Sequence, residues 1–530
     1  MKHPVNNRAA ILYLTTSIPY VNAQPHIGHA LEFVQGDVLA RYYRQRSVDV
    51  RYQSGADENS LKNVQAAERE GIPVQDLVAR NAARFSEAGE VLGASFDDFI
   101  RTSSEPRHVA GVYRLWQACV ERGDIYKRPY HGLYCVGCET FYDESELIDG
   151  RCPIHETVPE IVEEENYFFR LSHYAAELEQ LIETDQLRIV PEARKNEVLA
   201  FIRRGLHDFS ISRSQARAHG WGIPVPGDVS QVIYVWFDAL TNYISALEYG
   251  NPDEQSCYQQ YWVEADQRIH LIGKDITRFH AIYWPAMLLS AGVPLPTSIF
   301  VHGFLTINGR KISKSLGNVV DPLQLITSYG VDGVRYYLLR KIPATQDGDF
   351  SEPEFVRTYN ADLADQLGNL VSRVLKMIIQ YCDGKVPVPT QYTAVDQELI
   401  DLIANVQPQI ELELRQFALH KALTLVWSVI EAANKYVVTT EPWIVARQLK
   451  AQPDNINLQQ RLDTILFVLA ETLHLIAVLL RPFLPKIAAT ILNQLGLRED
   501  AEWNDPSCWS ESLVGVEVRS GGVLFPKLTT

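Results

Sequence analysis

The spacing of apolar residues at the start of the chain predicts a strand, a helix and a second strand. Residues 11–17 form an apolar run of strand length. After a turn rich in proline and asparagine, residues 28–46 carry apolar side chains at helical spacing, and residues 48–56 again have the pattern of a buried strand. The apolar positions of the predicted helix are Ala30, Leu31, Val34, Val38, Leu39 and Tyr42. This order of elements is typical of α/β nucleotide-binding domains.

The pattern changes twice further along the chain. Between residues 126 and 165, cysteines, glycines and acidic residues replace the alternation of strands and helices, which indicates an insertion. The α/β pattern returns between residues 231 and 301. Residues 355–497 are then almost entirely helical in pattern, and the stretch 417–437 places its apolar residues on one face. Several such helices joined by short breaks predict a bundle.

We therefore predict an α/β protein whose Rossmann-type parallel sheet is interrupted by an insertion and followed by an all-α bundle. The predicted boundaries place the two halves of the α/β domain at 1–117 and 211–303, the insertion at 118–210, a linking domain at 304–354, the bundle at 355–500 and a tail at 501–530. We expect the tail, which mixes glycine, serine and tryptophan, to pack back as an irregular segment.

Composition limits the classes of protein that fit. The chain has 530 residues, of which 46% are hydrophobic and 22% charged, and these values exclude disordered and fibrous classes. The net charge of −16 excludes a protein that coats nucleic acid by bulk charge, although it leaves room for a local basic groove. Seven cysteines are an odd and sparse set, so we expect a reducing, cytoplasmic compartment rather than a disulfide framework.

Neither a secretion signal nor a membrane span is predicted. The N-terminus is polar and lacks an apolar secretion core. The most apolar run, residues 465–480, is interrupted by Glu471 and His474 and falls short of the ~18 apolar residues that cross a bilayer.

The first chemical motif, Pro25-His26-Ile27-Gly28-His29, lies at the predicted turn between strand and helix. A helix start offers free backbone N–H groups and the positive end of a dipole, and two imidazoles add donors at the same place. Gly28 lets a base or phosphate approach closely. The alternative is that His26 caps the helix and His29 faces solvent.

The second motif, residues 309–318, places Arg310, Lys311 and Lys314 between flanking glycines. Lysines suit phosphate as compact point charges, and the glycines favour a mobile loop that closes over a leaving group. The alternative is a solvated basic loop.

The third motif joins two pairs of candidate metal ligands. Cys135-x2-Cys138 is followed after thirteen residues by Cys152-x2-His155. Four such ligands in two paired knuckles favour a closed, tetrahedral and therefore structural zinc site. A disulfide and free thiols remain the alternatives.

The first two motifs, placed around an α/β core, resemble the HIGH and KMSKS elements of class I aminoacyl-tRNA synthetases. These enzymes join an amino acid to ATP, with magnesium, and pass it to tRNA. Charge builds on the α-phosphate and pyrophosphate, so positioned donors and lysines supply most of the catalysis. The resemblance implies that His26, His29, Lys311 and Lys314 are catalytic.

Further matches resemble the methionyl-tRNA synthetase family in particular, in its form with a single zinc knuckle. They run in order from residue 11 to the C-terminus, and the matching segments are 18–22, 234–243, 273–280 with Trp284, 369–373, 434–436 and 441–443. The family activates methionine as methionyl-adenylate and transfers it to the 3′ end of tRNA(Met). The short insertion leaves no room for the editing domain of the valine, isoleucine and leucine enzymes, and the end of the chain favours a monomer.

The resemblance also implies the residues of each binding site. The methionine pocket would be lined or shaped by Ile18, Tyr20, Trp236, Ala239, Leu240, Tyr243, Phe279 and His280, with Asp57 holding the ammonium group and Arg213 anchoring that end. ATP would be met by His26, Gly28, His29, Lys274, Asp275, Lys311 and Lys314. The CAU anticodon would be read by Asn369, Arg373, Pro442 and Trp443, with Trp443 stacking on a base.

The residues support these assignments but also have simpler interpretations. Aromatic rings contact a thioether favourably, by roughly 0.3–1.5 kcal/mol. However, Trp236, Phe279 and Trp284 in an apolar context are by default core, Asp57 alone fits a helix cap, and Trp443 after a proline fits a plug at a bundle end.

Two motifs depart from the family pattern. The family often has Gly-Thr-Asp-Glu-His-Gly where this chain has residues 55–60, so Asn59 and Ser60 replace histidine and glycine. Ile312 replaces the methionine of the KMSKS element as an apolar spacer. The alternatives to a methionine enzyme are a tRNA-binding relative without catalysis and another class I ligase, of which the cysteine enzyme is the nearest.

Overall fold

The computed structural model describes residues 9–137, 139–142, 144–153, 156–251, 256–312, 317–498, 509 and 512–529. The chain divides into two compact units, which we describe separately: Met1–Gly36 with Ser47–His302, and Asp37–Arg46 with Gly303–Thr530. The finer domain boundaries given above stay predictions.

A six-stranded sheet organises the first unit. Its strand order is β3-β2-β1-β12-β13-β7, and all neighbouring strands are parallel. The strands are β1 (Ile11–Thr16), β2 (Asp49–Ala56), β3 (Asp98–Arg101), β7 (Arg188–Val190), β12 (Gln267–Gly273) and β13 (Ser298–His302). This order confirms the predicted Rossmann-type sheet. It places the switch point at β1 and β12, and ligands of such sheets bind outside the carboxyl ends of the strands there.

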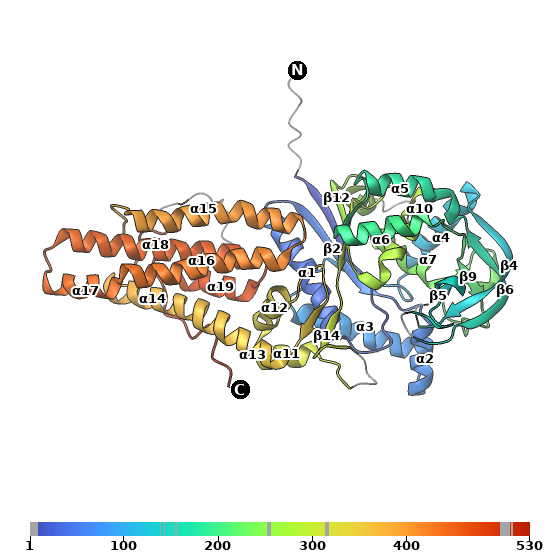
Figure 1. Cartoon of the computed structure of the whole chain (residues 1–530), viewed down its shortest axis with the longest axis horizontal. Helices are drawn as coiled ribbons and strands as arrows, with labels where there is room; N and C mark the ends of the chain where they lie inside the picture. The colour runs from blue at the N-terminus through green and yellow to red at the C-terminus, as the bar shows by residue number, and fades with distance from the viewer. Residues whose placement is uncertain are drawn as a thin grey trace, which may run out of the picture. The chain divides into compact units, whose positions relative to one another are not determined.

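Helices connect and cover this sheet (Figure 1). They are α1 (Ile27–Arg44), α2 (Leu61–Glu70), α3 (Val74–Val91), α4 (Pro106–Arg122), α7 (Val235–Leu240), α8 (Asn242–Ser245), α9 (Ser256–Tyr258) and α10 (Trp284–Ala291), with the short turns η3 (Gln259–Val263), η4 (Lys274–Ile276) and η5 (Phe279–Tyr283). The predicted strand at 11–17 and helix at 28–46 correspond to β1 and α1, each within two residues at its ends.

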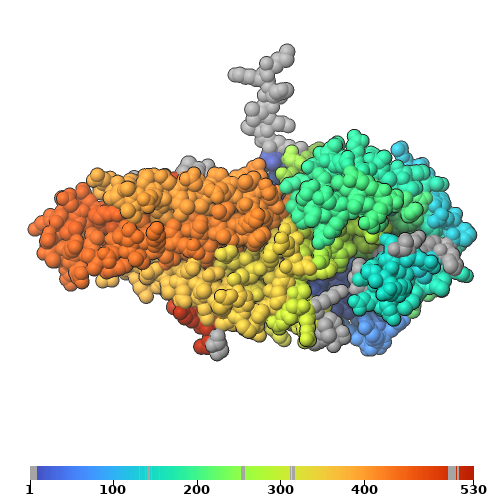
Figure 2. All heavy atoms as spheres, in the orientation of Figure 1, coloured from blue at the N-terminus to red at the C-terminus, as the bar shows by residue number. Residues whose placement is uncertain are grey.

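The predicted insertion is a separate antiparallel sheet with helices. The sheet has the order β5-β4-β6-β8, made of β4 (Ile125–Cys135), β5 (Thr140–Tyr142), β6 (Glu160–Phe169) and β8 (Phe209–Ser210). The neighbouring elements are η1 (Glu144–Glu146), η2 (Leu171–Tyr174), α5 (Ala175–Glu183), α6 (Glu192–Arg203), β9 (Ser212–Ser214), β10 (Pro224–Val225) and β11 (Asp228–Ile233). Residues of the insertion, cyan to green in the space-filling view, lie at the surface of the first unit (Figure 2).

One strand of the predicted insertion belongs to the main sheet. β7 pairs with β13 in parallel and forms the edge of the six-stranded sheet. The sequence pattern does not predict β7, because a strand of three residues is too short for a recognisable period.

The second unit begins with a small sheet and continues as a helical bundle. The sheet order is β15-β14-β16, from β14 (Leu305–Ile307), β15 (Arg310–Lys311) and β16 (Gly348–Phe350). The helices are α11 (Pro322–Tyr329), α12 (Val331–Arg340), α13 (Glu352–Thr358), η7 (Tyr359–Gly368), α14 (Asn369–Tyr381), α15 (Ala394–Arg415), α16 (Leu419–Thr440), α17 (Pro442–Ala451), α18 (Ile456–Leu480) and α19 (Pro485–Gln494). Figure 1 shows α15, α16 and α18 side by side, which confirms the predicted bundle.

Helix α18 forms the centre of this bundle. By length and composition α18 passes the test for a membrane span, but 94% of its apolar window is buried inside the protein. Glu471 and His474 interrupt its apolar sequence, and both are buried with His474 Nδ1 3.3 Å from a Glu471 carboxylate oxygen. A core helix of the bundle accounts for the apolar run.

The tail packs back onto the bundle, as predicted, over residues 512–529. Leu513, Val518 and Phe525 are buried, and Glu517 forms a β-bridge with Lys385. The bundle also holds the C-terminal half of α1 through a fully buried ion pair of 2.8 Å between Arg335 and Asp37.

Candidate active site

The two histidines of the first motif form one hydrogen-bonded turn at the start of α1. The backbone N–H of Gly28 donates to His26 Nδ1 at 3.1 Å, and the backbone N–H of His26 donates to His29 Nδ1 at 3.1 Å. The rings stack with their centroids 3.8 Å apart, and Phe85 packs edge-on against His29. His26 therefore caps the helix, and His29 is partly covered rather than fully solvated.

These contacts fix the chemical form of both rings. An Nδ1 that accepts a hydrogen bond carries no proton, so in each neutral ring the proton lies on Nε2. Burial lowers the pKa of His26 to about 4 and that of His29 well below its ordinary value. At neutral pH the turn thus offers two neutral Nε2–H donors beside the positive end of the α1 dipole.

A carboxylate on α1 organises the crevice at the switch point of the sheet. Glu32 accepts hydrogen bonds from the backbone N–H and the hydroxyl of Ser17, both at 2.6 Å, and its other oxygen lies 3.0 Å from His302 Nε2. Ser17 follows β1 and His302 ends β13, so Glu32 ties together two strand ends that flank β12.

The nucleotide residues implied by the resemblance lie at the end of the strand between them. Lys274 and Asp275 follow β12 directly, in the turn η4. A Cβ added at Gly273 would lie 3.0 Å from an Asp275 carboxylate oxygen, a tight contact, and 3.7 Å from the His302 ring, so these two side chains border the backbone at the end of β12.

An aromatic cluster contains most of the residues assigned to the methionine pocket. The Trp236 and Phe279 rings stack at 3.7 Å, and Tyr20 and His280 lie edge-on to Trp236 at 6.4 and 6.5 Å. The Trp236 indole N–H and the Tyr20 hydroxyl are buried and have no hydrogen-bond partner among the described residues. Trp284, in contrast, is fully buried core.

His280 is held in one neutral tautomer within this cluster. Its Nδ1 lies 3.0 Å from the carbonyl of Ile276, so Nδ1 carries the proton and donates. Its Nε2 then accepts from the Tyr243 hydroxyl at 2.7 Å. Burial lowers the pKa of His280 to about 4. The pair presents an uncharged wall to the cluster, which suits an apolar side chain.

Asp57 is a buried carboxylate beside the cluster. It lies in a β-bridge with Tyr20, its backbone N–H donates to the carbonyl of Pro19 at 2.9 Å, and the side chain is 3% exposed. Among the described residues, the Asp57 carboxylate accepts one hydrogen bond, from the backbone N–H of Asn59 at 3.3 Å. Burial, and then the charges of Asp238 and Glu139, raise the pKa of Asp57 well above its ordinary value. A cation bound here would relieve this cost, whereas α2 is capped by Ser60 and not by Asp57.

Asn59 and Ser60, which depart from the family pattern, both have hydrogen-bond partners. The Asn59 amide donates to an Asp238 carboxylate oxygen at 2.7 Å, and the second Asp238 oxygen lies 2.6 Å from His108 Nε2. The Ser60 hydroxyl accepts from the backbone N–H of Lys62 and donates to Glu139 at 3.0 Å. Asn59 therefore replaces an ionisable ring by an amide that stays uncharged at every pH of interest, and Ser60 supplies a helix cap.

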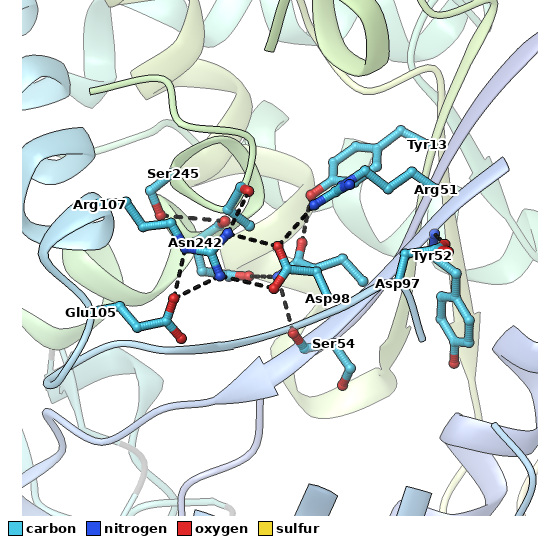
Figure 3. Close-up of polar contacts among 12 residues, drawn as sticks. Tyr13, Arg51, Tyr52, Ser54, Asp97, Asp98, Glu105, Arg107, Asn242 and Ser245 are labelled. Atoms are coloured by element: carbon cyan, nitrogen blue, oxygen red, sulfur yellow. Dashed lines mark hydrogen bonds and ion pairs between the residues drawn. The ribbon is translucent and has the colours of Figure 1, made fainter. Parts of the chain in front are cut away.

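The α7–α8 segment, which carries Trp236 and Tyr243, is anchored by a polar network on its far side (Figure 3). Arg107 pairs with both oxygens of Asp98 at 2.8 Å and donates to the carbonyl of Ala246. Gln53 donates to Asn242 at 2.8 Å and accepts from the Tyr13 hydroxyl at 2.6 Å. β1, β2 and β3 thus fix the position of the segment through side chains that the sequence motifs do not include.

Four further pocket residues lie near these groups. Ala239 and Leu240 are buried in α7, and Ile18 is half-buried beside Gly55. Arg213 is buried, and its guanidinium donates to the Tyr134 hydroxyl at 2.7 Å. Nine of the ten assigned methionine residues lie in or shortly after β1, β2, α7, α8 and η5, and Arg213 lies in β9.

The KMSKS-like motif is only partly described. Arg310 and Lys311 form β15, which pairs with β14. Lys314 lies outside the described residues, and Lys311 is placed by its backbone alone.

Two of the four candidate zinc ligands lie within the described residues. Cys135 and Cys152 are buried in a small cluster with Tyr142, against which Leu133 and Leu147 pack. Cys138 and His155 lie outside the described residues, and the described residues alone contain no group of three metal-binding side chains. One thiol from each predicted knuckle is therefore present at a common position, and the zinc site stays a prediction.

The residues assigned to the anticodon lie in the helical bundle. Asn369 begins α14, and the exposed Arg373 one turn later bonds to Asn434 of α16 at 2.5 Å. Asn434 lies roughly 9 Å before the end of α16, at 1.5 Å of rise per residue. At the end of α16, Glu441, with a φ of 43°, turns the chain into α17. Pro442 is buried at the start of α17, and Trp443 is 40% exposed, so it does not plug the bundle.

Comparison with known families agrees with this arrangement over nearly the whole chain. A sequence profile described as tRNA synthetases class I (M) matches residues 12–157 and 142–375, and one described as the anticodon binding domain of methionyl tRNA ligase matches residues 386–530. The chain belongs to the methionyl-tRNA synthetase family. The resemblance drawn from the motifs is thereby confirmed, as is the combination of a Rossmann-type unit with a helical anticodon-binding unit.

Individual members of the methionyl-tRNA synthetase family are similar to nearly the whole of this chain. The Methionine–tRNA ligase of Brucella suis is 44% identical over 97% of both chains, and that of Clostridium acetobutylicum is 42% identical over 97% of this chain and 78% of its own. The structure of Mycobacterium tuberculosis methionyl-tRNA synthetase in complex with methionyl-adenylate matches with a TM-score of 0.91 and 40% identity, covering 98% of this chain and 100% of that one.

The sequence motifs do not include several polar residues around the site of this family member. Glu32, His302, His108 and Glu139 were not identified, although each has a short polar contact to a site residue or a strand end. Glu32 alone had a local signal, since it follows His29 by three residues on the same helix. The partners of the other three are distant in sequence, so no spacing rule points to them.

Proposed function

We propose that the chain is a methionine–tRNA ligase that activates methionine with ATP and charges tRNA(Met). The observation that carries this proposal is the whole-length match to the methionyl-tRNA synthetase family, combined with a turn of two neutral histidine donors at the switch point of the sheet. A family match alone fixes ancestry, whereas the intact turn supplies the donors that the chemistry needs.

In the first step a methionine carboxylate oxygen attacks the α-phosphorus of ATP. A new bond forms between that oxygen and phosphorus, the bond to the bridging oxygen breaks, and pyrophosphate leaves. Negative charge builds on the phosphate oxygens, and the Nε2–H groups of His26 and His29 stabilise it as fixed donors. Because the rings are already neutral and oriented, no proton has to move for them to act.

The nucleotide is held by groups around this turn. Lys274 and Asp275 follow β12 and meet the nucleotide, and Gly28 leaves the helix start open to phosphate. Lys311 and Lys314 offset the charge of the leaving pyrophosphate. Magnesium, when bound with ATP, neutralises phosphate charge.

Methionine binds in the aromatic cluster of the first unit. Asp57 pairs with the substrate ammonium group, which compensates the buried carboxylate. Arg213 supports that end of the site. The rings of Tyr20, Trp236 and Phe279 contact the thioether, and Ile18, Ala239, Leu240, Tyr243 and His280 shape the apolar wall.

In the second step the terminal ribose hydroxyl of tRNA attacks the carbonyl carbon of methionyl-adenylate, and AMP leaves. Asn369, Arg373, Pro442 and Trp443 recognise the CAU anticodon on the bundle, with the exposed Trp443 ring stacking on a base at about 1–3 kcal/mol. This places the protein in translation and its initiation.

The remaining parts of the proposal concern metal, assembly and location. Cys135, Cys138, Cys152 and His155 hold one structural zinc ion, and the two buried thiols of the Cys135–Cys152 cluster support this donor set. The protein acts as a monomer in the cytoplasm without a membrane partner. The sparse cysteines favour a reducing compartment, and burial of α18 inside the protein accounts for its apolar run without a membrane.

Pyrophosphate exchange into ATP tests the activity directly. We expect exchange that depends on methionine and is not supported by leucine or cysteine at equal concentration. Exchange with leucine or cysteine but not methionine would overturn the specificity, and no exchange with any amino acid would overturn the function.

Two variants separate the proposed sites. Lys314→Ala should leave methionine binding nearly intact and slow exchange by about 100-fold, as loss of a transition-state contact does. Trp443→Ala should weaken charging of tRNA(Met) about tenfold and spare exchange. Ile456→Ala, at another exposed apolar residue of the same bundle, should change neither.

A further inference from the structure

Glu139 is a buried residue of the insertion that contacts two elements of the amino-acid site. It follows the first cysteine pair directly, its side chain is fully buried, and its φ of 51° lies in the left-handed region. A non-glycine residue in this conformation is held there by its surroundings. Hydrogen bonds of its carboxylate and its carbonyl to two neighbouring elements hold Glu139 in this conformation.

The Glu139 carboxylate caps helix α2. The same carboxylate oxygen accepts two hydrogen bonds, one from the backbone N–H of Leu61 at 2.7 Å and one from the Ser60 hydroxyl at 3.0 Å. A negative charge at a helix N-terminus also interacts favourably with the helix dipole. Asp57 lies three residues before Ser60, so the carboxylate fixes one end of the short segment that carries Asp57.

The other end of that segment is fixed by β1. The backbone N–H of Asp57 donates to Pro19, and Tyr20 bridges to Asp57. The segment from Asp57 to Ser60 is therefore held between the end of β1 and Glu139. Inside the segment, the backbone N–H of Glu58 donates to the Thr102 hydroxyl at 2.9 Å and the Asn59 amide donates to Asp238, so Glu139 supplies the contact at the end that leads into α2.

The main chain of Glu139 holds the second element. The Tyr234 hydroxyl donates to the Glu139 carbonyl, and Tyr234 is the residue that precedes α7. Helix α7 carries Trp236, and its Asp238 bonds to Asn59 of the Asp57 segment. One residue of the insertion thus contacts both walls of the site.

The second carboxylate oxygen of Glu139 has an unusual environment. It is buried and has no hydrogen-bond partner among the described residues, and the same is true of the Tyr20 hydroxyl. Leaving a buried carboxylate oxygen without a partner costs stability. Glu139 also raises the pKa of Asp57 through its charge, after burial and Asp238, so the two carboxylates lie within electrostatic reach.

We propose that Glu139 is a positioning residue for methionine, which sets the place of Asp57 and of α7 by clamping α2 and Tyr234 from the insertion. This inference rests on the proposed function and adds that the insertion contributes to amino-acid affinity. The nucleotide residues at β12 and α1 have no hydrogen bond to Glu139 among the described contacts, so ATP affinity is independent of it.

Steady-state exchange kinetics of Glu139→Ala and Glu139→Gln test the clamp. For Glu139→Ala we expect the KM for methionine to rise about tenfold or more, the cost of a lost charged cap. The KM for ATP should stay within about twofold, and kcat should fall less than kcat/KM for methionine. Glu139→Gln keeps one carbonyl oxygen for Leu61 and should recover part of the loss. Glu160→Gln, on an exposed residue of β6, should match the wild-type protein.

The outcomes separate the clamp from the function it serves. The clamp is overturned if both variants retain the wild-type KM for methionine, or if Glu139→Gln loses ATP and methionine affinity equally together with its melting temperature. If Glu139→Ala fails to fold, Glu139→Gln alone decides. A wild-type protein without methionine-dependent exchange would instead overturn the proposed function, since the clamp presupposes that activity.

Discussion

The Nδ1 atoms of His26 and His29 are both occupied by backbone N–H groups of their own turn. This relationship leaves Nε2 as the only nitrogen of each ring that is able to meet a ligand, and it makes that nitrogen a donor. The lowered pKa of both rings keeps them neutral near pH 7. The turn therefore binds a ligand through two oriented, neutral N–H donors and not through a positive charge on the rings.

The activity of variants at position 29 should depend on how far the hydrogen-bond donor of the new side chain extends. His29→Ala and His29→Asn should slow methionine-dependent exchange by about 10²–10³, the cost of one oriented donor. His29→Gln should lose less, because its amide nitrogen extends to the position of Nε2 while that of asparagine reaches only Nδ1. Exchange rates at saturating substrates measure the order.

The methionine KM of the same variants provides the control. Since His29 acts on phosphate and not on the amino acid, this KM should change by less than about threefold. Equal activity of the asparagine and glutamine variants would contradict the role of Nε2.

Asp57→Asn should make the free protein more stable and the enzyme much worse. The pKa of Asp57 is raised, so its ionised form at neutral pH is disfavoured by burial and by neighbouring carboxylates. An uncharged amide removes that cost, and the melting temperature should rise by a few degrees. Loss of the charge that meets the ammonium group should raise the KM for methionine about 100-fold.

Thermal unfolding by circular dichroism and exchange kinetics measure the two effects of Asp57→Asn. Asp454→Asn, at an exposed residue before α18, should alter neither. A less stable Asp57→Asn protein would show that the carboxylate serves the fold and not the ligand.

Local patterns were sufficient to predict the elements that carry the motifs. The apolar run of β1 and the helical spacing of α1 are local properties of the sequence, and the histidine turn follows from their junction. The bundle was predictable for the same reason, because each of its long helices carries a complete apolar face. These features depend on neighbours within a few residues.

The supporting contacts were not predictable, because they join residues that only the folded sheet brings together. Glu32 and His302 are 270 positions apart, and Asn59 and Asp238 are 179 apart. Nothing local distinguishes His108 from an ordinary helical histidine. The edge strand β7 was missed because its pairing with β13, and not its own sequence, makes it a strand.

Zinc content should depend on both described thiols of the insertion. We expect about one zinc ion per chain in the purified protein by mass spectrometry of the metal, and loss of most of it in Cys152→Ser and in Cys135→Ser. A structural site contributes folding energy, so both variants should also melt at lower temperature. Cys257→Ser, outside the cluster, should retain the metal. Unchanged metal content in both cluster variants would exclude the site.

Acid should destabilise the first unit partly through His280. The pKa of its buried imidazole is lowered from 6.5 to about 4 in the folded protein. Between these values the unfolded chain binds more protons, so stability falls as pH decreases through this window and is unaffected above it. For one histidine the loss is about 1.4 kcal/mol per pH unit, or roughly 2–3 kcal/mol between pH 7 and pH 4.5.

Urea unfolding followed by tryptophan fluorescence tests this at several pH values. His280→Gln keeps a donor toward Ile276 and an acceptor toward Tyr243, but its amide does not titrate. The free energy of unfolding of this variant should therefore fall less between pH 7 and pH 4.5 than that of the wild-type protein, by roughly 2–3 kcal/mol. His207→Gln, at an exposed histidine, should follow the wild-type curve. If His280→Gln lost as much stability as the wild-type protein, the ring would have to accept a proton inside the folded cluster, which its contacts with Ile276 and Tyr243 oppose.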